Sequence, residues 1–249
     1  MITPSVTKLV NSMLAGDKKA MAQLISLAEN ESQALPEILD IIRPHRGKAY
    51  LIGVTGPPGA GKSTLVDKLV SKIRKGGLSV GIIAVDPTSP LSGGAVLGDR
   101  VRMQRHYLDD GVFIRSMATR GSHGGLSQAV EATAGLLDAF GKDIVIIETV
   151  GVGQTELSIT QIADILVLVL VPESGDDIQA LKAGISELAD IIVINKADRG
   201  GAERLVDEFK AMGACGHRKS EPAVMATQAI NNIGIEELYQ EIDKRRKTC

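Results

Sequence analysis

The chain has 249 residues, of which 44% are apolar and 23% are charged, and its formal net charge is −2. This composition is typical of a globular protein with one large domain, and the near-neutral charge gives no attraction for nucleic acid or an anionic membrane surface. Two cysteines, a longest apolar run of 165–171 and no leader pattern at the N-terminus predict a cytoplasmic protein without disulfides or a transmembrane segment. We therefore expect neither nucleic acid nor a membrane among its partners.

Residues 1–48 differ from the rest of the chain because they carry only helical patterns. Apolar residues recur at helical spacing in three stretches, Asp17 is placed to cap the second helix, and Pro36 suits the first turn of the third. No chemistry is evident in these helices. We expect a short helical appendage over residues 1–48 that packs against or covers a domain over residues 49–249.

From Ala49 onward, strand and helix patterns alternate regularly. Apolar segments typical of buried strands lie at 50–55, 79–85, 111–116, 143–149, 165–171, 191–195 and 223–226. Helical patterns follow the first of these segments and also cover 126–140, 177–188, 203–212 and 235–247. This alternation predicts an α/β fold with a doubly wound, mostly parallel sheet that binds ligands outside the carboxyl ends of its strands.

A glycine-rich segment follows the first predicted strand and matches the phosphate-binding P-loop at every fixed position. Glycines there allow close backbone approach, and successive N–H groups at a helix N-terminus bind phosphate oxygens. Lys62 is expected to reach the β- and γ-phosphates, and the Ser63 hydroxyl to ligate Mg²⁺. The alternative is a glycine-rich turn without a ligand. The segment reads Gly56, Pro57, Pro58, Gly59, Ala60, Gly61, Lys62, Ser63 and then Thr64.

Two acidic residues follow the second predicted strand. Asp86 stands at the end of that strand, where a carboxylate can hold Mg²⁺ or a water bound to it, or can instead cap the next segment. Asp99 precedes Arg100 and Arg102, and is a second candidate carboxylate for the metal and the reaction. The two arginines have an alternative role in surface ion pairs.

The segment 143–151 resembles a Walker B strand, because an apolar run delivers Glu148 to the phosphate side and Gly151 follows three residues later. Glu148 is expected to order the water shell of the metal, and the Gly151 N–H to face a γ-phosphate. Gln154 is placed to orient a water molecule, although no general base is evident. The alternative is a buried strand with a carboxylate at its exposed end.

Asn195, Lys196 and Asp198 form an NKxD pattern after the sixth predicted strand. The Asp198 carboxylate can accept two hydrogen bonds from guanine, and adenine offers neither donor, so the pattern predicts GTP specificity. The Lys196 stem can lie along the base, and Asn195 can brace the loop. The alternative is a helix cap at Asp198.

Six stretches together resemble the methylmalonyl-CoA mutase-associated GTPases, a MeaB/ArgK/MMAA-like family once labelled as lysine/arginine/ornithine transport ATPases. The resemblance extends from about residue 49 to residue 245, and its motifs between the P-loop and Gln154 are specific to the family. The stretches are 56–64, 85–94, 97–103, 114–121, 148–154 and 195–198.

The resemblance implies a P-loop GTPase of the SIMIBI type that serves an adenosylcobalamin-dependent acyl-CoA mutase. Such a chaperone gates cofactor loading and protects or reactivates the mutase. The implied cofactors are Mg²⁺ and GTP or GDP, and adenosylcobalamin is involved only indirectly through the mutase. Because no glutamine directly follows Gly151, we expect slow intrinsic hydrolysis that the partner stimulates.

The resemblance also implies roles for individual residues. Asp86, Asp99 and Glu148 become the metal and switch carboxylates, and Lys62, Glu148 and Gln154 join Asp99 as the catalytic set. The segment Gln228-Ala229-Ile230 lies where the family has a Ser-Ala loop that contacts the base, with Gln in place of Ser.

Members of the family usually continue past the position of Cys249 with a helical arm for dimerisation, so we expect a short form without that arm. A monomer and a homodimer through the GTPase face are both open. Two other functions are alternatives: a nickel-insertion metallochaperone GTPase, which requires Cys or His ligands, and an ATPase or kinase component of amino-acid transport. Competition between GTP and ATP distinguishes the latter.

Overall fold

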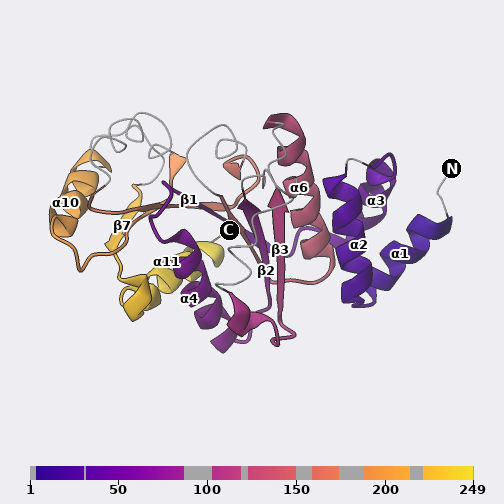
Figure 1. Cartoon of the computed structure of the whole chain (residues 1–249), viewed down its shortest axis with the longest axis horizontal. Coiled ribbons are helices and arrows are strands. Elements are labelled where there is room, and N and C mark those ends of the chain that lie inside the picture. Colours follow the sequence, from indigo (N-terminus) through magenta and orange to yellow (C-terminus); the bar gives the residue numbers. More distant parts are fainter. Residues whose placement is uncertain are drawn as a thin grey trace, which may run out of the picture.

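A computed structural model of the chain describes residues 4–30, 32–86, 103–118, 123–149, 159–173, 188–213 and 221–248. In these ranges, seven parallel strands form one sheet in the order β3-β2-β4-β1-β5-β6-β7 (Figure 1). The sheet confirms the predicted α/β, doubly wound architecture. The strands are β1 (Tyr50–Thr55), β2 (Val80–Asp86), β3 (Val112–Ala118), β4 (Ile144–Glu148), β5 (Ile165–Leu170), β6 (Ile191–Ile194) and β7 (Ala223–Ala226).

The strand sequences are apolar throughout because both faces of the sheet are buried. Successive side chains of a strand point to opposite faces, so each strand contributes to two separate cores. Ile144 and Ile146 of β4 belong to one apolar cluster, whereas Val145 and Ile147 belong to the other. β1 lies between β4 and β5, which are its two neighbours in the sheet. The chain reverses its strand order there, which is where ligands bind in open α/β sheets.

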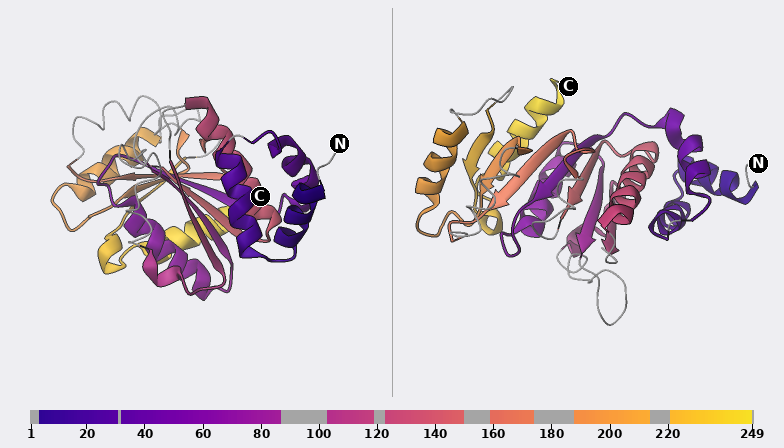
Figure 2. Two further views of the ribbon diagram at one scale, coloured as in Figure 1. Left: turned by 45° about the vertical axis from the view of Figure 1, so that its right-hand side comes forward. Right: turned by 90° about the horizontal axis from the view of Figure 1, so that it is seen from above.

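Helices cover the two faces of the sheet (Figure 2). On one face, α4 (Lys62–Lys75) contacts β1, β2 and β4, and α11 (Ile235–Arg246) packs beside it. On the other face, α6 (His123–Ala139) covers β2 and β4, and α10 (Ala202–Gly213) covers β6 and β7. The sequence pattern of each helix places it only approximately, and most of the expected boundaries differ from the observed ones by one to three residues.

The N-terminal residues form three helices beside α6 (Figure 1), and the second of them also contacts the edge strand β3 through Arg115 and Glu29. They are α1 (Pro4–Leu14), α2 (Lys18–Glu29) and α3 (Leu35–Ile42). The Asp17 carboxylate accepts hydrogen bonds from the Lys19 and Ala20 N–H groups at 2.7 and 3.3 Å, which confirms the expected cap. Pro36 lies in the first turn of α3, also as expected. The domain boundary between residues 48 and 49 stays a prediction.

Aspartates just before three strands accept hydrogen bonds from main-chain N–H groups at the starts of neighbouring strands. The carboxylates of Asp143, Asp164 and Asp190 accept hydrogen bonds from the N–H groups of Ser79, Leu51 and Leu166 at 2.7, 2.7 and 2.8 Å. Each carboxylate satisfies a donor at the edge of the ladder, where no strand partner lies opposite it. These three aspartates therefore have a structural role.

One sequence expectation differs from the structure at a strand end, and another falls on residues that the structure does not describe. β3 continues to Ala118, two residues beyond the predicted end, because it pairs with β2 up to Asp86. The helix expected over 177–188 lies outside the described residues except for Leu188. None of the helices in the described ranges is long and apolar enough to cross a membrane.

Candidate functional site

The glycine-rich segment forms a tight loop between β1 and α4. Gly56 has a φ of +139° and Gly61 a φ of +89°, which are conformations that side chains rarely adopt. A Cβ on Gly56 would lie 2.0 Å from the Val169 carbonyl oxygen, and one on Gly61 would lie 2.4 Å from Asn195 Nδ2. The glycines are thus required by close neighbours in β5 and in the loop after β6, and not only by the turn itself.

The Lys62 side chain lies within this loop. Its Nζ donates hydrogen bonds to the carbonyl oxygens of Gly56 and Pro57 at 2.7 and 3.0 Å, and the residue is only 7% exposed. Gly61 is the residue before α4, and it has no side chain that can cap the first turn of the helix. A buried ammonium group and the amino end of a helix therefore lie at the same loop, and both favour an anion.

Ser63 connects the start of α4 to the end of β4. Its Oγ donates a hydrogen bond to Glu148 Oε1 at 2.6 Å, and both residues are buried. Asp86 ends β2, whose Ala84 lies opposite Glu148 in the ladder, so the two carboxylates leave adjacent strands at the same edge. A hydroxyl and two carboxylates form an all-oxygen set of the kind that Mg²⁺ prefers.

Asn195 holds three loops together beneath the site. Its Nδ2 donates to the Ala60 carbonyl oxygen at 2.8 Å, and its Oδ1 accepts from Thr227 Oγ1 at 3.0 Å and from the Ala229 N–H at 3.1 Å. The side chain is 2% exposed. One amide therefore joins the P-loop to the loop after β6 and to the loop after β7, which goes beyond the expected bracing of its own loop.

The residues after Asn195 have the geometry of a loop that presents side chains outward. Lys196 has a φ of +57°, and the Ala197 N–H donates to the Thr227 carbonyl oxygen at 3.0 Å. Asp198 is exposed and Lys196 is half-buried. The turn is thus fixed by main-chain bonds, and the Asp198 carboxylate faces solvent at the carboxyl edge of the sheet.

Gln228-Ala229-Ile230 lies beside this turn, next to Thr227, whose carbonyl oxygen accepts from Ala197. The Gln228 main chain exchanges hydrogen bonds with Ile233 at 3.0 and 3.2 Å, and its Oε1 accepts from Asn231 Nδ2 at 3.0 Å. The glutamine side chain is therefore occupied locally, and the main chain of the short helix Ala229–Asn231 is what the loop presents.

These residues fit GTP and Mg²⁺. A glycine-rich loop with a buried lysine suits phosphate groups, and Ser63 with the carboxylates of β2 and β4 suits the metal. An exposed carboxylate beside the Ala229 loop suits the donors of guanine. No group of three or more His, Cys, Asp or Glu side chains with metal-binding geometry occurs among the residues that the structure describes.

The structure brings together Lys62, Ser63, Asp86, Glu148 and the residues of the NKxD turn at one edge of the sheet. Asp99, Arg100, Arg102, Gly151 and Gln154 lie outside the described residues. Sequence reasoning missed Thr227, which is fully buried and donates to Asn195, and the Thr149 hydroxyl, which donates to Thr55 Oγ1 at 3.1 Å. Small hydroxyl residues after strands carry no distinctive signal, so only the topology reveals these contacts.

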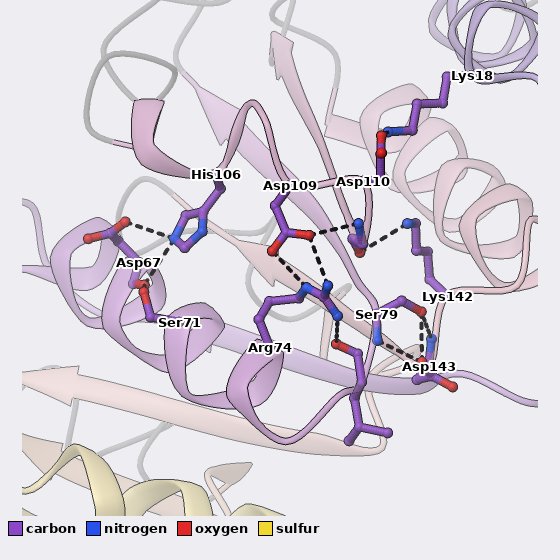
Figure 3. Close-up of polar contacts among 12 residues, drawn as sticks. Lys18, Asp67, Ser71, Arg74, Ser79, His106, Asp109, Asp110, Lys142 and Asp143 are labelled. Atoms are coloured by element: carbon purple, nitrogen blue, oxygen red, sulfur yellow. Dashed lines mark hydrogen bonds and ion pairs between the residues drawn. The ribbon is translucent and has the colours of Figure 1, made fainter.

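A second polar region lies along α4, toward the amino ends of the strands (Figure 3). Arg74 donates from Nε and Nη2 to both oxygens of Asp109, at 2.8 and 2.9 Å. This hydrogen-bonded guanidinium lowers the pKa of the Asp109 carboxyl below its usual range. Burial lowers the pKa of Lys142, whose Nζ donates to the Gly111 carbonyl oxygen at 3.0 Å.

The family model described as "Methylmalonyl Co-A mutase-associated GTPase MeaB" matches residues 21–249. The chain belongs to this family. This MeaB-family protein is 52% identical over 247 residues to a Pyrococcus abyssi protein named as a GTPase. The alignment covers 97% of this chain and 76% of the Pyrococcus protein. The chain is also 37% identical over 210 residues to the methylmalonic aciduria type A homolog of Caenorhabditis elegans, covering 78% of this chain and 53% of that one.

The fold of this MeaB-family protein is also that of a solved relative. The crystal structure of an LAO/AO transport system kinase superposes with a TM-score of 0.79 at 29% identity, covering 99% of this chain and 77% of that one. The protein is a GTPase with the P-loop fold of the SIMIBI type, and this fold implies binding of GTP and GDP. The predicted family, fold and enzyme class are confirmed.

Proposed function

We propose that the protein is a GTP-operated chaperone of an adenosylcobalamin-dependent acyl-CoA mutase such as methylmalonyl-CoA mutase. It gates loading of the cofactor and protects or reactivates the mutase, and adenosylcobalamin acts only through that partner. The observation that carries the proposal is the match of residues 21–249 to a family described as mutase-associated. The name of the Caenorhabditis elegans relative, a methylmalonic aciduria protein, supports it.

In this proposal the loop of residues 56–64 holds the phosphates of GTP. The Lys62 ammonium leaves the carbonyl oxygens that it now contacts and pairs with the β- and γ-phosphates. Ser63, Asp86 and Glu148 would hold Mg²⁺, which supplies positive charge against the phosphate oxygens. The 2.6 Å contact between Ser63 and Glu148 supports a shared task for these two groups.

Guanine would lie against the turn after β6. The Asp198 carboxylate accepts from the two donors of the base, the Lys196 stem covers one face of the ring, and the main chain of Gln228-Ala229-Ile230 lies at its edge. Asn195 supports this arrangement because its side chain hydrogen-bonds to both Ala60 of the phosphate loop and Ala229 of the loop beside the base.

The remaining predicted roles belong to residues outside the described ranges. Asp99 acts as a switch carboxylate toward the metal, the Gly151 N–H senses the γ-phosphate, and Gln154 orients the attacking water. Hydrolysis is slow for the isolated protein because a group supplied by the partner completes the site, an effect of up to about 10⁵-fold in other GTPases.

The proposal is tested by measuring GTP turnover of the purified protein while an adenosylcobalamin-dependent methylmalonyl-CoA mutase is added. We expect a low kcat that rises at least about tenfold at saturating mutase. A fast kcat that no mutase changes contradicts the chaperone function. Equal affinity for ATP and GTP in a competition assay would instead favour an ATPase or kinase of amino-acid transport.

The proposed role of Asp198 in guanine recognition is tested separately with Asp198→Asn. The amide offers a donor where guanine also offers a donor, so we expect GTP affinity to fall about 100-fold or more with little change in stability, because the side chain is exposed. An unchanged preference for GTP over ATP would remove Asp198 from this role.

Three further proposals concern the whole protein. Residues 1–48 form an appendage that packs on α6, and residues 49–249 form the GTPase domain. The protein acts in the cytoplasm. It is either a monomer that binds the mutase or a homodimer that forms through the GTPase face. Light scattering with GDP and with a non-hydrolysable GTP analogue distinguishes the monomer from the dimer.

A further inference from the structure

A buried carboxylate, that of Asp67, lies on α4 one turn after Ser63. Asp67 follows Ser63 by four residues, so the two side chains share one face of the helix. Asp67 Oδ1 accepts from Arg105 Nε at 2.6 Å, and Arg105 Nη2 contacts Oδ2. His106 Nε2 lies 3.0 Å from the same Oδ1 (Figure 3). Arg105 and His106 are consecutive residues of the short helix η2 (Gln104–His106), and both contact the Asp67 carboxylate of α4.

The hydrogen bonds define which nitrogen of His106 carries a proton. Nε2 lies 3.2 Å from the Asp67 carbonyl oxygen as well as 3.0 Å from Oδ1, and both of these oxygens only accept. Nε2 is therefore the donor. Burial and the charge of Arg105 lower the pKa of His106, against a smaller opposite effect of Asp109. The contact accordingly works with a neutral ring and needs no second proton.

The same segment is also held to α4 by an apolar contact. Met103 is fully buried and belongs to the cluster that includes Val66 and Val70 of α4. Apolar packing sets the distance between η2 and the helix, but it is not directional. Hydrogen bonds to a buried charged group are directional and about twice as strong as neutral ones. The Asp67 contacts are thus suited to fix the rotation of α4 about its axis.

We propose that Asp67 is a positioning residue for GTP hydrolysis. By holding α4 in one rotation, it keeps the Ser63 hydroxyl at Glu148, 2.6 Å away, where the metal is to be bound. This inference rests on the proposed role of Ser63 as a Mg²⁺ ligand. It predicts that loss of the Asp67 contacts weakens the use of Mg²⁺ more than it weakens the binding of the nucleotide itself.

The chain offers a matched control on the same helix. Arg74 of α4 pairs with Asp109 of the same loop through two hydrogen bonds, two turns farther from the P-loop. Asp109→Asn removes a carboxylate from a contact of similar chemistry without touching the first turns of α4. If Asp67 only stabilises the packing of α4, Asp67→Asn and Asp109→Asn have the same effect on the Mg²⁺ response and on GDP affinity.

The experiment measures the Mg²⁺ concentration at half-maximal GTP hydrolysis, together with the affinity for a fluorescent GDP analogue in EDTA. For Asp67→Asn we expect the half-saturating Mg²⁺ concentration to rise about tenfold, the lower end of effects from groups that orient metal ligands, with Mg²⁺-free GDP affinity within about twofold. Asp67→Glu keeps the charge and restores most of the Mg²⁺ response. Asp109→Asn leaves that response unchanged.

Arg105→Gln removes one partner at a side chain that is 44% exposed, and serves if Asp67→Asn does not fold. We expect it to raise the half-saturating Mg²⁺ concentration about threefold, part of the tenfold effect of losing the whole contact. A wild-type Mg²⁺ response in either variant, or equal changes in the Asp67 and Asp109 variants, overturns the inference. Hydrolysis by the wild-type protein that does not depend on Mg²⁺ overturns the proposed role of Ser63 as a Mg²⁺ ligand instead.

Discussion

Removing the Asn195 side chain is expected to unlink the P-loop from the base loops. In Asn195→Ala, the Ala60 carbonyl, the Thr227 hydroxyl and the Ala229 N–H lose their partner, and all three groups belong to residues that are at most 2% exposed. A buried polar group without a partner costs about 1–3 kcal/mol. The lower bound for three groups is about 3 kcal/mol, a large part of the 5–15 kcal/mol that stabilises a typical domain.

Urea denaturation measures this loss directly, and a thermal melt should show a midpoint lower by about 6–12 °C. The matched control is Asn231→Ala, which removes one exposed hydrogen bond to Gln228 Oε1 in the same loop. That variant should stay within about 0.5 kcal/mol of the wild type. If the unfolding free energies of the two variants agree, the bridging role of Asn195 is refuted.

Asn195→Asp distinguishes the hydrogen bond to Ala60 from the hydrogen bonds to Thr227 and Ala229. It keeps an oxygen for Thr227 and Ala229 but places a second oxygen opposite the Ala60 carbonyl oxygen, where Nδ2 now donates at 2.8 Å. The repulsion displaces the P-loop, so GTP affinity should fall at least about tenfold. Wild-type affinity in a titration with a fluorescent GTP analogue would show that the P-loop does not depend on this contact.

Two further predictions concern single sites elsewhere. Burial and the charge of Arg105 lower the pKa of His106 below about 6.5, so the unfolded chain binds a proton that the folded protein does not, and stability should decrease as the pH falls through about 6.5. His106→Gln keeps an N–H donor without a titrating ring, and urea denaturation at pH 7.5 and 5.5 should show a smaller difference than in the wild type. Gly56→Ala should cost more than about 3 kcal/mol and abolish GTP binding, because its Cβ would lie 2.0 Å from the Val169 carbonyl oxygen. Binding of GTP by that variant, measured by calorimetry, would contradict the geometry of the loop.

Much of the fold was predictable because its signals are local. Continuous apolar strands, helical spacing between them and the glycine loop after β1 give the α/β class and the expected place of the phosphates. Asp86 and Glu148 were predictable as strand-end carboxylates, and the structure places them on adjacent strands at one edge. The Asp17 cap and Pro36 were likewise predictable, since capping depends on residues within one turn.

By itself, then, the sequence determined the nucleotide-binding motifs, the family and the alternation that buries both faces of the sheet, since each depends on residues close together in the chain. Only the tertiary structure decided which distant groups share a contact. Asn195 meets Ala60 across 135 residues, and Asp67 meets His106 across 39. The strand order brings the loops of β1, β6 and β7 to one edge. Contacts of Met103, Arg105 and His106 place η2 along α4. A hydrogen bond is defined by the positions of both partners, and no spacing in the sequence encodes those positions.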